Sequence, residues 1–232
     1  MPFRLFGLDQ LAALAATGVA AFALVRRARR NPAPRVLRFG LAAVLAAAAS
    51  GWLAFVHARY GLSLWDLLPL HLCDFLILVA VWALVTLRPL ACELLYFWSA
   101  GTLLAMVTPD LGVGFPHPAF VAFFTLHGAV VVSAALVVFG LGRRPRPGAA
   151  WRAFGATLAY AGVVALVNLA FGTNFLFLCR KPDEPTLLDA FGPWPAYLGT
   201  VALFALGLFH LMAWPLRERP ASPWAGAGPS PP

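Results

Sequence analysis

Long stretches of apolar residues recur along the whole chain and limit the folds that are open to it. A helix needs about 20 mainly apolar residues to cross a bilayer, and stretches of this kind, separated by charges, prolines or glycines, fill most of the sequence. Strands of a membrane barrel alternate apolar with polar residues, and these runs do not alternate. We therefore predict an all-α, polytopic transmembrane helical bundle of about seven helices, near residues 8–25, 39–58, 63–87, 89–107, 118–140, 151–172 and 194–216.

The composition leaves no room for a soluble domain. Hydrophobic residues make up 61% of the chain and charged residues only 11%, which departs far from soluble proteins. Residues 1–219 are predicted to form a single transmembrane domain. Residues 220–232 are rich in proline, glycine, alanine and serine, which predicts a disordered cytoplasmic tail. The expected location is a cell membrane, which the chain crosses several times.

The basic residues lie at the ends of the predicted helices, and the chain has a net charge of +8. They do not gather on one face, so membrane topology explains them better than nucleic-acid binding does. Thirteen lie on one side of the predicted bundle and four on the other. Because basic residues favour the cytoplasmic side, we predict an N-terminus outside and a C-terminus inside. The larger group contains Arg26, Arg27, Arg29, Arg30, Arg35, Arg38, Arg88, Arg143, Arg144, Arg146, Arg152, Arg217 and Arg219.

Ionisable residues inside spanning helices are costly and are candidates for function. The helix predicted over residues 63–87 starts with Ser63 and Asp66 in a capping-box-like pattern, and it carries His71 and Asp74 on one face, three residues apart. His127, in the next helix that enters from the outside, is predicted at a similar depth, so the two histidines are expected to meet. A carboxylate beside an imidazole suits catalysis or proton transfer. A polar pair that only joins helices is the alternative.

The outer segment after the sixth helix supplies candidate substrate-binding residues. Asn168 lies in the outer half of that helix and Asn174 in the following loop, while Arg180 and Lys181 are placed to hold a lipid phosphate. Structural hydrogen bonding by the asparagines and a solvated basic loop are the alternatives.

Two ionisable residues lie deeper, toward the predicted cytoplasmic half. Glu93 and His210 are expected to pair with each other as a structural contact. Two polar layers at different depths also suit a transport path.

The three cysteines, Cys73, Cys92 and Cys179, have no paired metal spacing. No phosphate-binding glycine loop is visible. We therefore predict no metal and no cofactor, and no protein partner can be identified from the sequence.

Several of these residues lie in motifs that resemble a known family. The segments are Leu68-Pro69-Leu70-His71-Leu72-Cys73-Asp74, His127-Gly128, and the long run from Asn174 to Pro195. They resemble the YwaF-like bacterial integral membrane protein family, which is grouped with the transmembrane protein 164 family. The resemblance implies a membrane acyltransferase that uses a cysteine and a histidine to move fatty acyl chains between phospholipids.

The resemblance also implies roles for particular residues. His127 corresponds to the catalytic histidine. The animal motif reads Pro-Cys-His, and this chain has Leu70 where that cysteine stands. Cys73 lies three residues later, on roughly the same helix face, and is the candidate nucleophile. A small apolar filler is the alternative role for Cys73.

These observations support three functional hypotheses. The first is a phospholipid acyltransferase or lipid ester hydrolase, with His127, His71, Cys73 and Asp74 in the catalytic site and membrane lipids as partners. The second is a small-solute or proton-coupled transporter. The third is a non-catalytic lipid-binding membrane protein.

Overall fold

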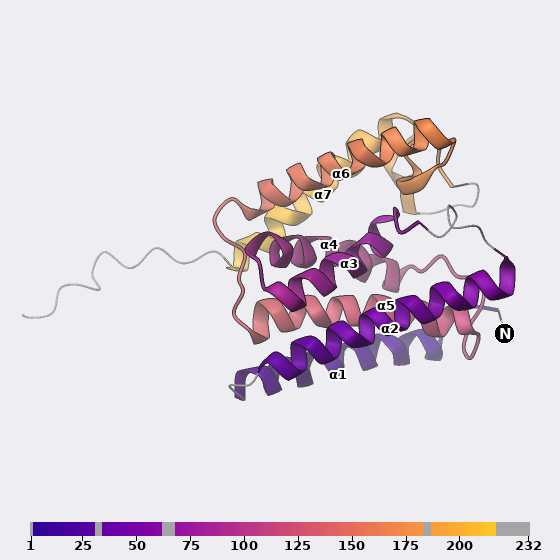
Figure 1. Cartoon of the computed structure of the whole chain (residues 1–232). Coiled ribbons are helices and arrows are strands. Elements are labelled where there is room, and N and C mark those ends of the chain that lie inside the picture. The colour runs from indigo at the N-terminus through magenta and orange to yellow at the C-terminus, as the bar shows by residue number, and fades with distance from the viewer. Residues whose placement is uncertain (1, 31–33, 62–67, 183–186, 217–232) are drawn as a thin grey trace, which may run out of the picture.

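The chain folds into helices that run back and forth between two ends (Figure 1). The computed structural model describes residues 2–30, 34–61, 68–182 and 187–216. These residues contain seven α-helices, which confirms the predicted all-α bundle. The helices are α1 (Leu8–Arg30), α2 (Pro34–Tyr60), α3 (Leu72–Thr86), α4 (Pro89–Val107), α5 (Pro118–Ala135), α6 (Ala149–Phe171) and α7 (Ala196–Ala213).

Six of these helices are long and apolar enough to cross a membrane, with α5 extended to Gly140 by a π-helical turn and α7 to Leu216 by a 3-10 turn. The exception is α3, whose 15 residues span about 22 Å at 1.5 Å per residue. The hydrocarbon core of a bilayer is about 30 Å thick. The protein is thus a multi-pass membrane protein with one shorter apolar helix.

The helix predicted over residues 63–87 is shorter than expected. Leu68, Pro69 and Leu70 are not helical, and His71 has an extended backbone (φ −68°, ψ 144°) as the N-cap of α3. Proline has no N–H and disfavours helical geometry in the residue before it, so the helix starts only after this segment. His71 therefore lies at the start of α3 and not inside a helix. The predicted capping box at 63–66 and the predicted tail at 220–232 lie outside the described residues.

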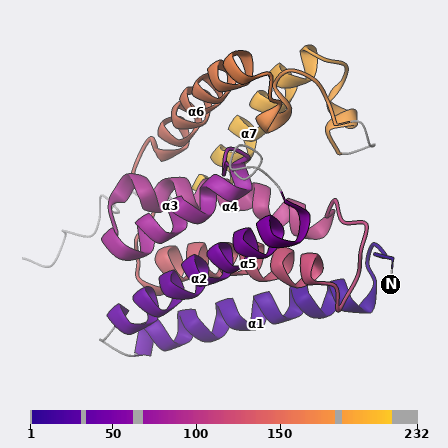
Figure 2. The same ribbon diagram turned by 45° about the vertical axis from the view of Figure 1, so that its right-hand side comes forward.

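The helices are arranged in layers around α4. Figures 1 and 2 show α6 and α7 together on one side of α3 and α4, with α5, α2 and α1 on the other side. The side chains of Leu95 and Phe97 in α4 are fully buried in the main apolar core. We call the end at which α1 finishes and α4 and α6 begin the arginine end. The opposite end, at which α3, α5 and α7 begin, is the loop end.

Candidate functional site

The candidate nucleophile lies near the loop end, at the second position of α3. Cys73 is half-buried, and its thiol lies against the hydroxyl of Thr102 in α4. Thr102 is 1% exposed, and its Oγ1 has no hydrogen-bond partner among the residues that the structure describes. Leaving a buried hydroxyl unpaired costs about 1–3 kcal/mol. Sequence reasoning missed Thr102, because a threonine in an apolar helix usually bonds its own backbone.

His127 is held in one defined tautomer. Its Nδ1 lies 2.9 Å from the carbonyl oxygen of Phe123, and its ring stacks on that of Phe123 with 4.0 Å between centroids. A carbonyl oxygen only accepts hydrogen bonds, so Nδ1 carries the hydrogen of the neutral ring. The other nitrogen, Nε2, is left as a proton acceptor, which is the form that a general base requires.

The residues one turn before and one turn after His127 pack in an apolar cluster that also includes α1 and α4. Phe123 and Val131 lie one turn before and one turn after His127, and both pack in the cluster that contains Met106 of α4. Met106 is one turn beyond Thr102 on the same face of α4. Helix α3 packs on both α4 and α5, and the approach of His127 to Cys73 and Thr102 stays a prediction.

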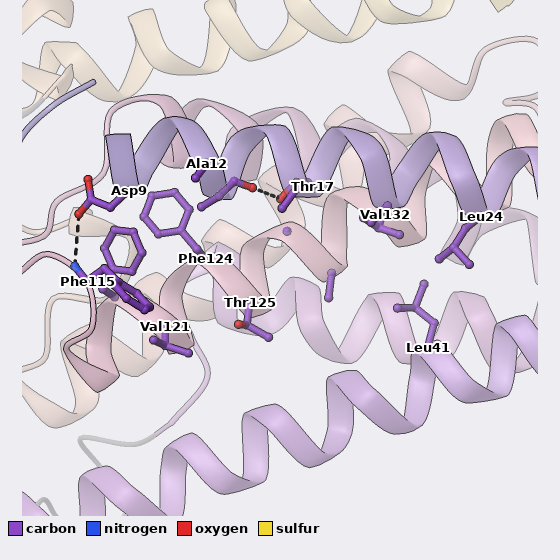
Figure 3. Close-up of a pocket in the computed structure, with 16 residues that line it drawn as sticks. Asp9, Ala12, Thr17, Leu24, Leu41, Phe115, Val121, Phe124, Thr125 and Val132 are labelled. Atoms are coloured by element: carbon purple, nitrogen blue, oxygen red, sulfur yellow. Dashed lines mark hydrogen bonds between the residues drawn. The ribbon is translucent and has the colours of Figure 1, made fainter. Parts of the chain in front are cut away.

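A separate apolar groove runs between α1, α2 and α5 (Figure 3). It has a volume of about 630 Å³, and Gly128 lines it where α1 comes close. A Cβ at Gly128 would meet Thr17 Oγ1 at 2.7 Å. His127 does not line the groove, because successive residues point about 100° apart around a helix. Asp9 and Thr17 at its rim are engaged: Asp9 Oδ2 accepts from Phe115 N at 3.2 Å, and Thr17 Oγ1 donates to Ala13 O at 2.9 Å.

His71 lies among aromatic side chains at the loop end. Its ring centroid is 5.4 Å from that of Phe175 and 5.3 Å from that of Phe177. Asp74 is close enough to interact electrostatically with His71, as their spacing predicts, and also with Tyr160 of α6. Each of the two candidate histidines thus has its own aromatic neighbours among the described residues. A contact between His71 and His127 stays a prediction.

Tyr160 was not singled out from the sequence. Its hydroxyl donates to the carbonyl oxygen of Leu70 at 2.9 Å, and its ring stacks on Phe75 at 4.5 Å. Tyr160 therefore holds the non-helical segment that precedes α3 and contains Leu70. A tyrosine in the middle of an apolar helix, with a polar tip that needs a partner, is the signal that could have identified it.

The two candidate asparagines shape the loop after α6. Asn168 is buried. Its Nδ2 donates to the carbonyl oxygen of Phe175 at 2.9 Å. Its Oδ1 accepts from the backbone N–H of Phe175 at 2.9 Å and from the hydroxyl of Thr173 at 2.8 Å. Asn174 Oδ1 accepts from the backbone N–H groups of Cys179 and Arg180 at 3.0 and 3.2 Å. These amides are largely occupied by the protein itself, so their direct effect is on the shape of the loop.

The same loop contains strained backbone and two basic residues. Leu176 and Phe177 have left-handed backbones, with φ of 57° and 55°, which costs each bulky residue about 1–3 kcal/mol and often marks a functional site. Lys181 Nζ bonds Asp189 Oδ1 at 2.9 Å and lies 5.5 Å from the ring centroid of Tyr197. Arg180 has an exposed side chain and remains the candidate for a lipid phosphate.

Glu93 does not pair with His210, contrary to the sequence prediction. Its carboxylate, 2% exposed, is held by Arg146 Nε and Arg152 Nη2, both at 2.8 Å. The hydrogen bonds with Glu93 raise the pKa of the Arg146 guanidinium above its usual value. His210 instead has Nδ1 2.9 Å from Leu206 O and its ring edge against Trp151.

Comparison with known proteins places this architecture in a family. A protein of Treponema pallidum (strain Nichols), called "Uncharacterized protein", is 31% identical over 121 residues. This match covers 50% of the chain and 49% of the relative, so the chain spans about half the length of that relative. No solved structure matches the chain. The model of the TMEM164 family matches residues 5–213, and the chain therefore belongs to the TMEM164 family, as its motifs predicted.

Proposed function

We propose that this membrane protein acts on lipid esters, as a phospholipid acyltransferase or a lipid ester hydrolase, in the bacterial plasma membrane. The observation that carries the proposal is the 2.9 Å contact of His127 Nδ1 with Phe123 O, from which we assign the ring hydrogen to Nδ1. Nε2 is therefore the ring nitrogen that can accept a proton. The half-buried thiol of Cys73 and the unpaired hydroxyl of Thr102 supply the other groups that acyl transfer needs.

The reaction uses these groups in a fixed order. His127 Nε2 takes the proton of Cys73 Sγ, and the thiolate attacks the carbonyl carbon of the lipid ester. Thr102 Oγ1 donates a hydrogen bond to the negative oxygen that forms, and this stabilises the tetrahedral intermediate. The C–O bond of the ester then breaks, and the lysolipid leaves with the proton from the imidazolium. A second lipid hydroxyl, or water, loses its proton to His127 and attacks the thioester, which releases the acyl product and restores the thiol.

The loop end supplies the proposed binding residues. Arg180 is placed to pair with the phosphate of the substrate, because its side chain is exposed and guanidinium groups bind phosphate well. Lys181 is paired with Asp189 and is assigned to the same binding region beside Arg180. Asn168 and Asn174 act through the loop whose backbone they hold. His71 and Asp74 form a supporting pair at the entrance, against Phe175 and Phe177.

The transport hypothesis is weaker, because its deep polar residues are engaged in static contacts. Two arginines hold Glu93 from both sides, and His210 is bonded to its own helix. We therefore assign Glu93 and His210 structural roles.

The decisive experiment is acyl exchange by the purified full-length protein in liposomes that contain a labelled phospholipid and an unlabelled lysolipid acceptor. We expect wild-type protein to transfer the label and both Cys73→Ser and His127→Ala to lose at least about 100-fold in rate, the usual scale of a general base. Cys179→Ser and His57→Ala are matched controls, since both side chains are exposed and lie outside the proposed reaction.

Each result separates the hypotheses. Unchanged activity in Cys73→Ser would remove the thiol mechanism, whereas unchanged activity in His127→Ala would remove the base. If wild-type protein is inactive on varied phospholipids but retains bound lipid through purification, the protein is a non-catalytic lipid binder. Lipid analysis of cells that lack the protein, complemented with wild type or His127→Ala, tests the same point in the membrane.

A further inference from the structure

A large cavity opens at the arginine end, far from the proposed catalytic residues. It has a volume of about 990 Å³ and lies between the starts of α4 and α6, the end of α7 and the segment 142–148 that joins α5 to α6. Arg143, Arg144 and Arg146 line it, together with Trp151 and apolar residues such as Leu216. We propose that this cavity binds the phosphate group of an anionic phosphate ester, which goes beyond the proposed acyl transfer and does not depend on it.

Positive charge exceeds negative charge around the cavity. The residues that line it include three arginines and no acidic residue. Glu93 lies behind the wall, where its carboxylate is already shared by Arg146 and Arg152. Arg143 is near enough to Arg38 for the two guanidinium groups to repel each other. An anion bound beside Arg143 and Arg144 would relieve this repulsion. The carboxylate of Glu93 does not relieve it, because Arg146 and Arg152 already share its single negative charge.

The two available arginines extend from an ordered turn. The backbone N–H of Arg143 donates to Val137 O at 3.0 Å, and that of Arg144 donates to Gly142 O at 2.9 Å. Arg146 and Arg152 anchor the other end of the segment on Glu93. The guanidinium groups of Arg143 and Arg144 are thus carried by backbone that is fixed on both sides, which lowers the entropy lost when they bind a ligand.

The helix ends around the cavity add to the attraction for an anion. α6 starts after Gly148, which provides no side-chain cap, and Ala150 and Trp151 in its first turn line the cavity. The first N–H groups of a helix have no acceptor within the helix and carry partial positive charge. Together with the arginines, this is the arrangement that binds phosphate in many proteins.

Membrane topology alone also places arginines at helix ends, but it requires no cavity. Arg27 and Arg30 at the end of α1 are arginines that topology alone explains. They are exposed at the same end of the bundle and do not line the cavity. They provide matched controls for the removal of two charges. The apolar wall around Leu87, Ala213 and Leu216 is compatible with a lipid phosphate, and the experiment separates that source from free phosphate.

The test uses full-length protein in nanodiscs of zwitterionic phosphatidylcholine and measures the thermal unfolding temperature. One arm adds phosphatidic acid to the nanodiscs, and the other adds inorganic phosphate to the buffer at constant ionic strength. We expect a saturable rise in Tm for wild type. In Arg143→Gln/Arg144→Gln the apparent affinity falls at least about tenfold, as expected for the loss of two charge-assisted contacts. Arg27→Gln/Arg30→Gln keeps the wild-type affinity.

The outcomes decide both the site and its ligand. A rise with phosphatidic acid only identifies a lipid phosphate as the ligand, whereas the same rise with inorganic phosphate shows that a soluble phosphate group is enough for binding. The double lysine variant Arg143→Lys/Arg144→Lys keeps the charge and controls for folding; it should retain part of the affinity. Equal losses in the two glutamine variants would mean that surface charge alone attracts the anion, and the proposal would be wrong. No rise in wild type in either arm would also overturn it.

Discussion

Replacement of Glu93 by glutamine tests how the arginine end is held together. The carboxylate accepts five hydrogen bonds: from the backbone N, Nε and Nη2 of Arg146 at 3.1, 2.8 and 3.1 Å, and from Nε and Nη2 of Arg152 at 3.1 and 2.8 Å. Glu93→Gln keeps the shape but removes the charge and one acceptor oxygen. Two arginines are then left near a buried amide that cannot satisfy both.

The expected cost follows from burial and exposure together. Removing one partner of a buried charge pair costs about 3–5 kcal/mol. Here the side chains of Arg146 and Arg152 are 51% and 39% exposed, so water can replace part of what they lose, and we reduce the estimate to about 2–3 kcal/mol. For a protein of this size each kcal/mol lowers Tm by roughly 2–4 °C. Glu93→Gln should therefore lower Tm by roughly 4–12 °C.

The assay is thermal unfolding of the purified protein in one detergent, with a double-mutant cycle. Arg146→Gln should cost less than Glu93→Gln, because Glu93 keeps Arg152 as a partner. In Glu93→Gln/Arg146→Gln the two losses should not add, since both remove the same contact. A Glu93→Gln protein that unfolds within about 1 °C of wild type, or strictly additive losses, would refute the idea that this carboxylate holds the segment between α5 and α6.

Three further predictions address packing, the outer loop and topology. Gly128→Ala should destabilise the protein by about 1–3 kcal/mol, because its Cβ meets Thr17 Oγ1 at 2.7 Å, and adding Thr17→Ala should recover most of the loss in thermal unfolding. Asn168→Ala should cost about 2–4 kcal/mol and speed proteolysis of the following loop. In intact cells an impermeant maleimide should label Cys179 but not a cysteine replacing Gly142; the reverse pattern would overturn the N-out orientation.

The helices that the sequence predicted best have sharp apolar boundaries. α4 was expected at 89–107 and is observed at Pro89–Val107, because Pro89 at the first position sets its start. The end of α1 was placed near residue 25, but the helix continues to Arg30. Arginine is a good helix former, so the helix extends past the apolar run that defines the membrane segment. Hydropathy thus predicts the apolar part of a helix but not its full length.

The sequence predicted which segments are helical, but it did not predict which way a side chain points around its helix. Glu93 was paired with His210 because both were assigned to the same half of the bilayer. The actual partners, Arg146 and Arg152, follow Glu93 by 53 and 59 residues and lie in and after the segment that joins α5 to α6. His71 was placed in a helix on the basis of apolar length, although Pro69 gave a local reason for a later start. Contacts between helices depend on their rotation, which one sequence does not define when the helices are apolar all round.

The two proposed sites must bind different molecules, and the geometry of α4 shows why. Cys92 lines the cavity at the arginine end, and Thr102, beside Cys73, lies ten residues later in the same helix. That separation corresponds to about 15 Å along the axis. In a phospholipid the phosphate and the glycerol esters are only a few bonds apart, so a lipid with its phosphate among Arg143 and Arg144 cannot present its ester carbonyl to Cys73. The proposed acyl-transfer mechanism therefore predicts that the phosphate of the substrate lies at the loop end, where Arg180 is exposed. Loss of phosphate binding in the arginine variants and loss of acyl exchange in Cys73→Ser therefore report on separate sites.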